Sequence, residues 1–194
     1  MSFSLTDHPQ WASLLSFIQQ AEGPLILHIS DTETGSYPFV EKLIAAVKPA
    51  LILHTGDMAD EWKAGRLPEH VAGYKKHVVT LLDILKRSDA EVWLVPGNNE
   101  LPNYLRVHCD FPILPQNALK IYRGISMRLS HWPIENEQEA AFAIYGHNFS
   151  SDPNHPLDNP KKGVIYLNGV YEWTAIDCAT GQYCQISMKE RKPR

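Results

Sequence analysis

The sequence predicts an α/β fold in which two β-sheets stack face to face with helices outside them. In the first half of the chain, helical patterns alternate with short apolar runs, which is typical of parallel strands joined by crossover helices. In the second half, short apolar runs separated by glycines favour hairpins and a second, mostly antiparallel sheet. The length of 194 residues fits one domain, and we assign residues 1–194 to it.

The first half is expected to contain three helices and three strands. Each helix shows apolar residues three and four positions apart, and Gly23 and Pro49 mark the ends of the first two. The expected elements are a helix before Gly23, a strand over 24–30, a helix between Pro38 and Pro49, a strand over 51–54, a helix over 71–85 and a strand over 92–95.

The second half is expected to contain six short strands with glycine turns between them. Residues 150–163 are rich in proline, aspartate and asparagine, so we expect an exposed loop there. The strands are expected over residues 119–122, 125–129, 141–145, 164–168, 171–176 and 183–188.

Composition and charge argue against several classes of protein. The apolar content of 44% and charged content of 21% are those of an ordinary globular domain. The net charge of −4 gives no electrostatic footprint for nucleic acid or for an anionic membrane, so we expect neither as a partner. Three cysteines without C-x-x-C spacing and the lack of a long apolar segment point to the reducing cytoplasm. The oligomeric state stays open.

Five apolar runs end on a side chain that can bind a metal ion. These residues are Asp31, Asp57, Asn98, His131 and His147. In open α/β sheets, ligands bind outside the carboxyl ends of the strands, so we expect the five side chains at one site. Carboxylate, imidazole and amide groups suit divalent ions such as Mn²⁺, Fe²⁺ and Zn²⁺, and a shared carboxylate holds two ions about 3.5–4 Å apart. Asp57 is the natural shared ligand.

The order of these blocks, D-x-E, G-D, G-N-N-E, a lone His and G-H-N, resembles the calcineurin-like metallophosphoesterases. Within that superfamily the chain looks most like the small bacterial and archaeal single-domain phosphodiesterases. The resemblance covers the chain from Leu25 to about Ile176. It implies a four-layer α/β/β/α sandwich with two mixed sheets flanked by helices, and a centre with two metal ions.

The resemblance also implies which residues hold each ion. The first metal would be bound by Asp31, Glu33, Asp57 and Asn148. The second metal would be bound by Asp57, Asn98, His131 and His147. The chain departs from the family at the first site, because Glu33 and Asn148 stand where the family usually has histidine. Asn99 is a third departure, since the family has a His or Cys there that contacts the phosphate or protonates the leaving oxygen.

These departures make the two metal sites chemically different. The first site has only oxygen ligands, which favours Mn²⁺, Mg²⁺ or Ca²⁺, whereas the second suits Mn²⁺, Fe²⁺, Ni²⁺ or Zn²⁺. We therefore expect one or two divalent ions per chain, Mn²⁺ above all, as an asymmetric pair or as one tight ion with a weak companion. A competing interpretation of Glu33 is a solvated loop carboxylate. His155 is an alternative source of the missing imidazole.

The expected function is a metal-dependent phosphohydrolase, above all a phosphodiesterase acting on a small phosphoester or nucleotide-like substrate. A metal-bridging hydroxide would attack the phosphorus in line, and Asn98 and Asn99 would donate hydrogen bonds to the phosphate. An amide cannot deliver a proton, so we expect Asn99, as the catalytic residue, to give a slow enzyme. The alternative is a weakly active or inactive protein that uses the same fold as a binding or scaffold module.

Overall fold

The computed structural model describes residues 10–134, 140–147 and 163–187, and these form four α-helices, two 3₁₀ turns and nine strands. The helices are α1 (Trp11–Gln20), α2 (Tyr37–Val47), α3 (Val71–Lys86) and α4 (Pro102–His108), and the turns are η2 (Thr34–Ser36) and η3 (Pro68–His70). The strands are β1 (Leu25–Ile29), β2 (Leu51–His54), β3 (Glu91–Leu94), β4 (Ala118–Tyr122), β5 (Ile125–Leu129), β6 (Phe142–Tyr145), β7 (Ile165–Asn168), β8 (Glu172–Asp177) and β9 (Tyr183–Ser187).

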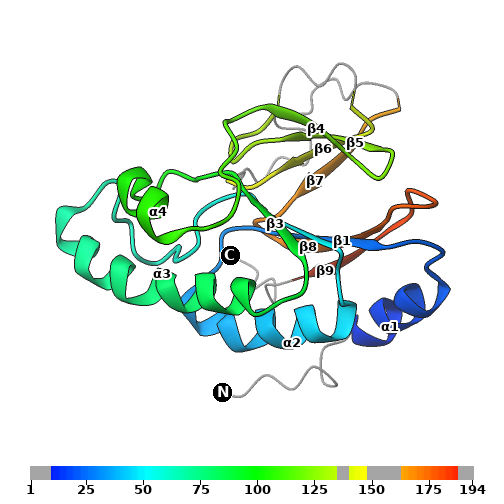
Figure 1. The fold of residues 1–194 in the computed structure, drawn as a ribbon, viewed down its shortest axis with the longest axis horizontal. Coiled ribbons are helices and arrows are strands. Elements are labelled where there is room, and N and C mark those ends of the chain that lie inside the picture. The colour runs from blue at the N-terminus through cyan, green and yellow to red at the C-terminus, as the bar shows by residue number, and fades with distance from the viewer. Residues whose placement is uncertain (1–9, 135–139, 148–162, 188–194) are drawn as a thin grey trace, which may run out of the picture.

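The strands form two stacked mixed sheets (Figure 1). The five-stranded sheet has the order β3-β2-β1-β8-β9, in which β1, β2 and β3 are parallel and β8 and β9 are antiparallel to their neighbours. The four-stranded sheet has the order β4-β5-β6-β7. The predicted α/β class with two mixed sheets, and the parallel pairing of the first three strands, are therefore confirmed.

The prediction of a mostly antiparallel second sheet is wrong. In that sheet only β4 and β5 pair antiparallel, whereas β5 with β6 and β6 with β7 are parallel. Strands β8 and β9 do not join it, because β8 pairs with β1 of the first sheet. Glycine marks a turn in the sequence, but it does not tell which sheet the next strand joins.

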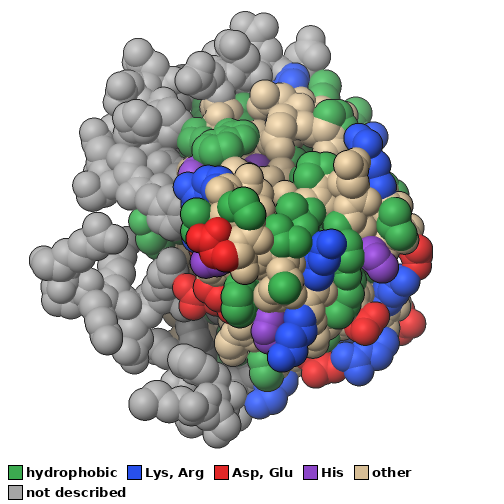
Figure 2. Space-filling view, turned by 90° about the vertical axis from the view of Figure 1, so that its left-hand side faces the viewer, with side chains coloured by type: hydrophobic (Ala, Val, Ile, Leu, Met, Phe, Trp, Pro, Cys, Tyr) green, Lys and Arg blue, Asp and Glu red, His purple; other side chains and the backbone are tan. Residues whose placement is uncertain are grey.

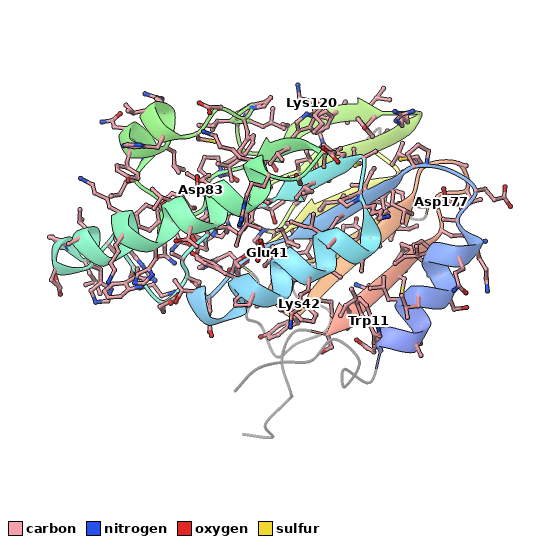
Figure 3. The ribbon with its side chains drawn as sticks, turned by 60° about the horizontal axis from the view of Figure 1, so that its bottom comes forward. Trp11, Glu41, Lys42, Asp83, Lys120 and Asp177 are labelled. Atoms are coloured by element: carbon pink, nitrogen blue, oxygen red, sulfur yellow. The ribbon has the colours of Figure 1, made fainter. Side chains whose placement is uncertain are left out.

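Two hydrophobic cores hold the layers together. The first lies between the five-stranded sheet and the helices and includes Leu14 of α1, Leu43 of α2, Leu81 of α3 and Leu105 of α4. The second lies between the two sheets and includes Ile26 of β1 packed with residues of β5, β6 and β7. Helices α1, α2 and α3 lie over the outer face of the five-stranded sheet (Figure 3). Within the described ranges no helix supplies a fourth layer over the four-stranded sheet.

The carboxyl ends of the strands are tied to one another at one end of the molecule. The backbone N–H of Asp31, after β1, donates to the carbonyl of Gly56, after β2, at 2.9 Å. The backbone N–H of Gly146, after β6, donates to the carbonyl of His131, after β5, at 3.2 Å. Because these bonds join successive strand ends, the predicted ligands come from separate elements to one edge. None of the described helices is long and apolar enough to cross a membrane.

Candidate metal centre

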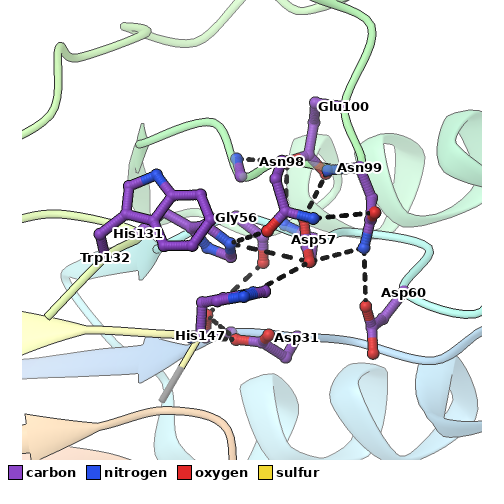
Figure 4. Close-up of polar contacts among 12 residues, drawn as sticks. Asp31, Gly56, Asp57, Asp60, Asn98, Asn99, Glu100, His131, Trp132 and His147 are labelled. Carbon is purple, nitrogen blue, oxygen red and sulfur yellow. Dashed lines mark hydrogen bonds and ion pairs between the residues drawn. The ribbon is translucent and has the colours of Figure 1, made fainter. Parts of the chain in front are cut away.

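Four of the predicted ligands form one compact cluster. One ligand atom each from Asp31, Asp57, His131 and His147 lies within 4.8 Å of the others (Figure 4). Each of the four residues lies two or three positions beyond the end of a strand, namely β1, β2, β5 or β6. The convergence expected from the strand ends is therefore present, and two carboxylates with two imidazoles form a donor set that fits a divalent transition metal ion.

Three of these residues have an uncommon backbone conformation. Asp31, Asp57 and His147 have φ angles of 48°, 56° and 36°, in the left-handed region. Non-glycine residues rarely occupy this region, and the strain persists only where the surroundings fix it. The left-handed conformation turns each side chain away from its strand and toward the shared cluster, so we infer that this strain is needed to form the centre.

Two glycines next to the ligands allow this close approach. A Cβ at Gly146 would collide with Ser30 Oγ and Asp31 Oδ2, and a Cβ at Gly97 would collide with Asp57 Oδ1. Both positions therefore require the absence of a side chain, which explains the glycine that precedes the histidine in G-H-N and the asparagines in G-N-N-E.

Asp57 is fully buried and held on both oxygens by Asn99. The backbone N–H of Asn99 donates to Oδ1 at 2.9 Å, and its side-chain Nδ2 donates to Oδ2 at 2.7 Å. Burial raises the pKa of Asp57 to about 8, with the carboxylate of Glu100 acting in the same direction and His131 opposing it. A cation beside Asp57 would favour its ionised form, so the buried carboxylate is suited to a metal ion.

The protonation of His131 is fixed by its neighbours. Its Nδ1 donates to the carbonyl oxygen of Thr55 at 2.7 Å, since a carbonyl only accepts. Burial lowers the pKa of His131, so the ring is neutral and Nε2 carries a lone pair. This lone pair faces Asn98 Oδ1 at 3.0 Å and Asp57 Oδ2 at 3.7 Å.

The orientation of Asn98 is fixed as well, because its Nδ2 donates to Asn99 Oδ1 at 3.0 Å. Its Oδ1 must then be the atom that faces the Nε2 lone pair of His131. Two hydrogen-bond acceptors such as Asn98 Oδ1 and neutral His131 Nε2 do not stabilise one another. A cation between them would be stabilised by both. The contact between Asn98 and His131 is therefore best explained as two ligands of one ion.

His147 completes the cluster from the side nearer to solvent. Its Nδ1 lies 4.0 Å from Asp57 Oδ2, and its backbone N–H donates to Asp31 Oδ2 at 3.3 Å. Burial lowers the pKa of His147 to about 4, and the nearby His131 adds to this effect. The ring is neutral at physiological pH and can act as a ligand.

The remaining predicted site residues have different positions. Glu33 is exposed and does not belong to the cluster, and its carbonyl oxygen accepts hydrogen bonds from the backbone and hydroxyl of Ser36. Asn148 and His155 lie outside the described residues. Asn99 is buried, and its Nδ2 donates to Asp60 Oδ1 at 2.9 Å as well as to Asp57. The roles of Glu33 and Asn148 as ligands stay predictions, as does contact between Asn99 and the phosphate.

Glu100 has a role in the centre that its local sequence does not reveal. This buried carboxylate accepts hydrogen bonds from the backbone N–H groups of Asp57, Met58 and Gly97, at 2.9 Å from Asp57 and 2.7 Å from Met58. It thus fixes the turn that carries Asp57 against the loop that carries Asn98. The final acid of G-N-N-E was visible in the sequence, but no local pattern showed that it would fold inward.

Comparisons with known proteins agree with this geometry. The model of the calcineurin-like phosphoesterase family matches residues 24–180, so the chain belongs to that family. No curated protein matches the sequence. Among solved structures, the chain is similar to the phosphoesterase YfcE from E. coli, with 15% identity, a TM-score of 0.52, and coverage of 85% of this chain and 100% of that one.

Two further solved structures share the fold. An archaeal phosphodiesterase has 12% identity and a TM-score of 0.52, with coverage of 84% of this chain and 99% of that one. The protein AQ665 of unknown function from Aquifex aeolicus has 17% identity and a TM-score of 0.50, with coverage of 76% and 90%. At these identities the likeness shows the fold. The family assignment and the cluster of ligands together define a metal-dependent phosphoesterase.

Proposed function

We propose that this protein is a cytoplasmic phosphodiesterase that uses Mn²⁺ to hydrolyse a small phosphoester or nucleotide-like substrate. The observation that carries the proposal is the convergence of Asp31, Asp57, His131 and His147 within 4.8 Å. The same fold without such a cluster would indicate membership of the family but not metal-dependent hydrolysis. Phosphodiesterase activity, as opposed to phosphoester hydrolysis in general, is favoured by the archaeal phosphodiesterase among the structural neighbours.

In this proposal Asp57, Asn98, His131 and His147 would hold one metal ion. Asp31 and Asp57 would hold a second, weaker ion, for which Glu33 and Asn148 are the further predicted ligands. Bound divalent ions supply Lewis-acid activation of water and neutralise the charge of the phosphate oxygens. The residues around them have a separate task, since Asn99 and Glu100 hold Asp57 and its turn in place.

Hydrolysis of bis-p-nitrophenyl phosphate with Mn²⁺ tests the proposal. We expect activity in the wild type and a loss of more than about 100-fold in Asp57→Ala and His147→Ala. Loss of a residue that only supports a ligand typically reduces activity about 10- to 100-fold, and loss of the ligand itself should reduce it further. Asp83→Asn is the matched control, because this aspartate lies on α3 (Figure 3), away from the cluster. Wild-type activity no higher than background with Mn²⁺, Ni²⁺, Co²⁺, Fe²⁺ or Zn²⁺ would contradict the proposal.

A binding module with this fold is the second candidate. Two observations favour it, namely that Glu33 is exposed outside the cluster and that the amide of Asn99 is already used by Asp57 and Asp60. The variant Glu33→His/Asn99→His/Asn148→His separates the two functions. A rise of roughly 100-fold or more in hydrolysis would support a degraded first site in an enzyme. An unchanged rate in a variant that binds two metal ions would support the binding module.

A further inference from the structure

Trp132 is a large exposed aromatic side chain at the edge of the metal centre. The residue is 44% exposed although it directly follows the predicted ligand His131. The ring centroid lies 4.4 Å from that of His147 at an interplanar angle of 62°, and 5.3 Å from that of His131 at 75° (Figure 4). The indole therefore meets both imidazoles edge to face and leaves much of its surface to solvent.

The backbone that carries this ring is held in place. The N–H of Trp132 donates to Ser130 Oγ at 3.2 Å, and Ser130 Oγ in turn donates to Gln116 Oε1 at 3.0 Å. The same oxygen accepts the N–H of His131 at 2.7 Å. A tryptophan whose backbone is held and whose ring packs against two imidazoles offers a surface at little cost in conformational entropy, which is the property that makes tryptophan effective in recognition.

We infer that Trp132 is a stacking surface for the nucleobase of the substrate, so that the substrate class is a small nucleotide phosphodiester. This inference rests on the proposed function. An indole that served only to cover the metal ligands would itself be buried. Trp132 is instead exposed, and its ring centroid lies 4.4 Å from that of His147. A phosphate at the metal centre would place an attached nucleoside over this exposed ring, and base stacking on an aromatic side chain is favourable for every base.

The charges at this end of the molecule favour a small nucleotide over a polymer. Figure 2 views this end directly, and on its described surface acidic, basic and histidine side chains are mixed. Asp60 pairs with Lys63 there, and the next cation along the loop is Arg66. A strand of nucleic acid requires a continuous basic groove along its backbone, which the described part of this face does not offer.

Two substrates with one leaving group test the inference with Mn²⁺ present. The p-nitrophenyl ester of thymidine 5′-phosphate carries a base, and methyl p-nitrophenyl phosphate does not. We expect the wild type to prefer the thymidine ester in kcat/KM, and Trp132→Leu to reduce this preference roughly 10-fold through a higher KM. Trp132→Phe should keep most of it. An equal preference in wild type and Trp132→Leu would overturn the inference.

Tyr183→Leu is the matched control. Tyr183 is 42% exposed and pairs with Ile176 at the opposite end of the five-stranded sheet, so its loss should leave the preference for the thymidine ester unchanged. An equal fall in this variant would show that the effect of Trp132→Leu is not local, and it would overturn the inference.

A binding measurement separates failure of the inference from failure of the proposed function. Calorimetric titration with AMP and with ribose 5-phosphate, on protein with Mn²⁺, compares ligands that differ by the base alone. We expect the wild type to bind AMP roughly 10-fold more tightly than ribose 5-phosphate, and Trp132→Leu to bind the two ligands with equal affinity. If neither ester is hydrolysed, the proposed function fails while this titration still decides the inference, and equal wild-type affinities would overturn it.

Discussion

Asn99 holds both carboxylate oxygens of Asp57, because its side-chain Nδ2 donates to Asp57 Oδ2 at 2.7 Å and its backbone N–H donates to Oδ1 at 2.9 Å. The same Nδ2 donates to Asp60 at 2.9 Å, and Asp60 pairs with Lys63. The residue that stands in place of an expected His or Cys thus connects the central carboxylate to a network that reaches the surface. Its geometry is that of a positioning residue.

Asn99→Leu should therefore weaken metal binding. The substitution keeps a similar volume but removes the side-chain donor to Asp57 and Asp60, and loss of such supporting hydrogen bonds typically reduces metal affinity about 10- to 100-fold. Calorimetric titration with Mn²⁺ measures the change, with Asn103→Leu on the exposed side of α4 as the control. An affinity equal to that of the wild type would show that Asn99 does not position Asp57.

Glu100→Gln should destabilise the fold even in the absence of metal. Its carboxylate accepts three backbone N–H groups, and an amide would turn a donor toward at least one of them. We expect a loss of about 2 kcal/mol or more in the free energy of unfolding, which urea denaturation in a chelator measures. Glu69→Gln, on the exposed turn η3, should change the free energy little. A similar stability of both variants would argue against the role of Glu100.

Buried histidines should make the protein sensitive to acid. Burial lowers the pKa values of His28 and His54 to about 3, whereas the unfolded chain titrates near 6.5. The unfolded state therefore binds more protons between these values, so stability is lost as pH falls below 6.5. The raised pKa of Asp57 opposes this effect with one proton over the same range, so we expect a net loss of about 1–2 kcal/mol from pH 6.5 to 5 in urea denaturation with a chelator. A free energy of unfolding that stays constant over this range would contradict the burial of neutral imidazoles.

The alkaline side should show the opposite slope because of Asp57. Its pKa is raised to about 8 from 3.8, so the folded state binds more protons than the unfolded state between these values, and stability falls as pH rises. Above pH 6.5 the histidines no longer oppose this effect. We expect stability without metal to decline from pH 6.5 to 8, and the decline to vanish in Asp57→Asn. A persistent decline in that variant would assign it to other groups.

The candidate site could be predicted from the sequence where a ligand directly follows an apolar run. Asp31, Asp57, His131 and His147 were found this way, since parallel strands bring their carboxyl ends to one edge. The assignment of Glu33 to the first metal site rests only on the resemblance to the calcineurin-like metallophosphoesterases, and its exposed carboxylate lies outside the cluster.

Long-range partners could not be predicted in the same way. The pairing of β8 with β1, and the contacts of Glu100 with the turn after β2, join segments that are distant in the chain. A local pattern shows that a strand or a buried carboxylate is present, but not which backbone it meets. These features are set by the packing of the whole sheet.

The number and affinity of bound Mn²⁺ ions can be measured by calorimetric titration of chelator-treated protein. We expect one tightly bound ion per wild-type chain and a second, weaker one at higher concentration, with the tight ion lost in Asp57→Ala and in His131→Ala. Wild-type protein that binds no Mn²⁺, or variants that bind it as tightly as the wild type, would contradict the assignment of these strand ends to a metal centre.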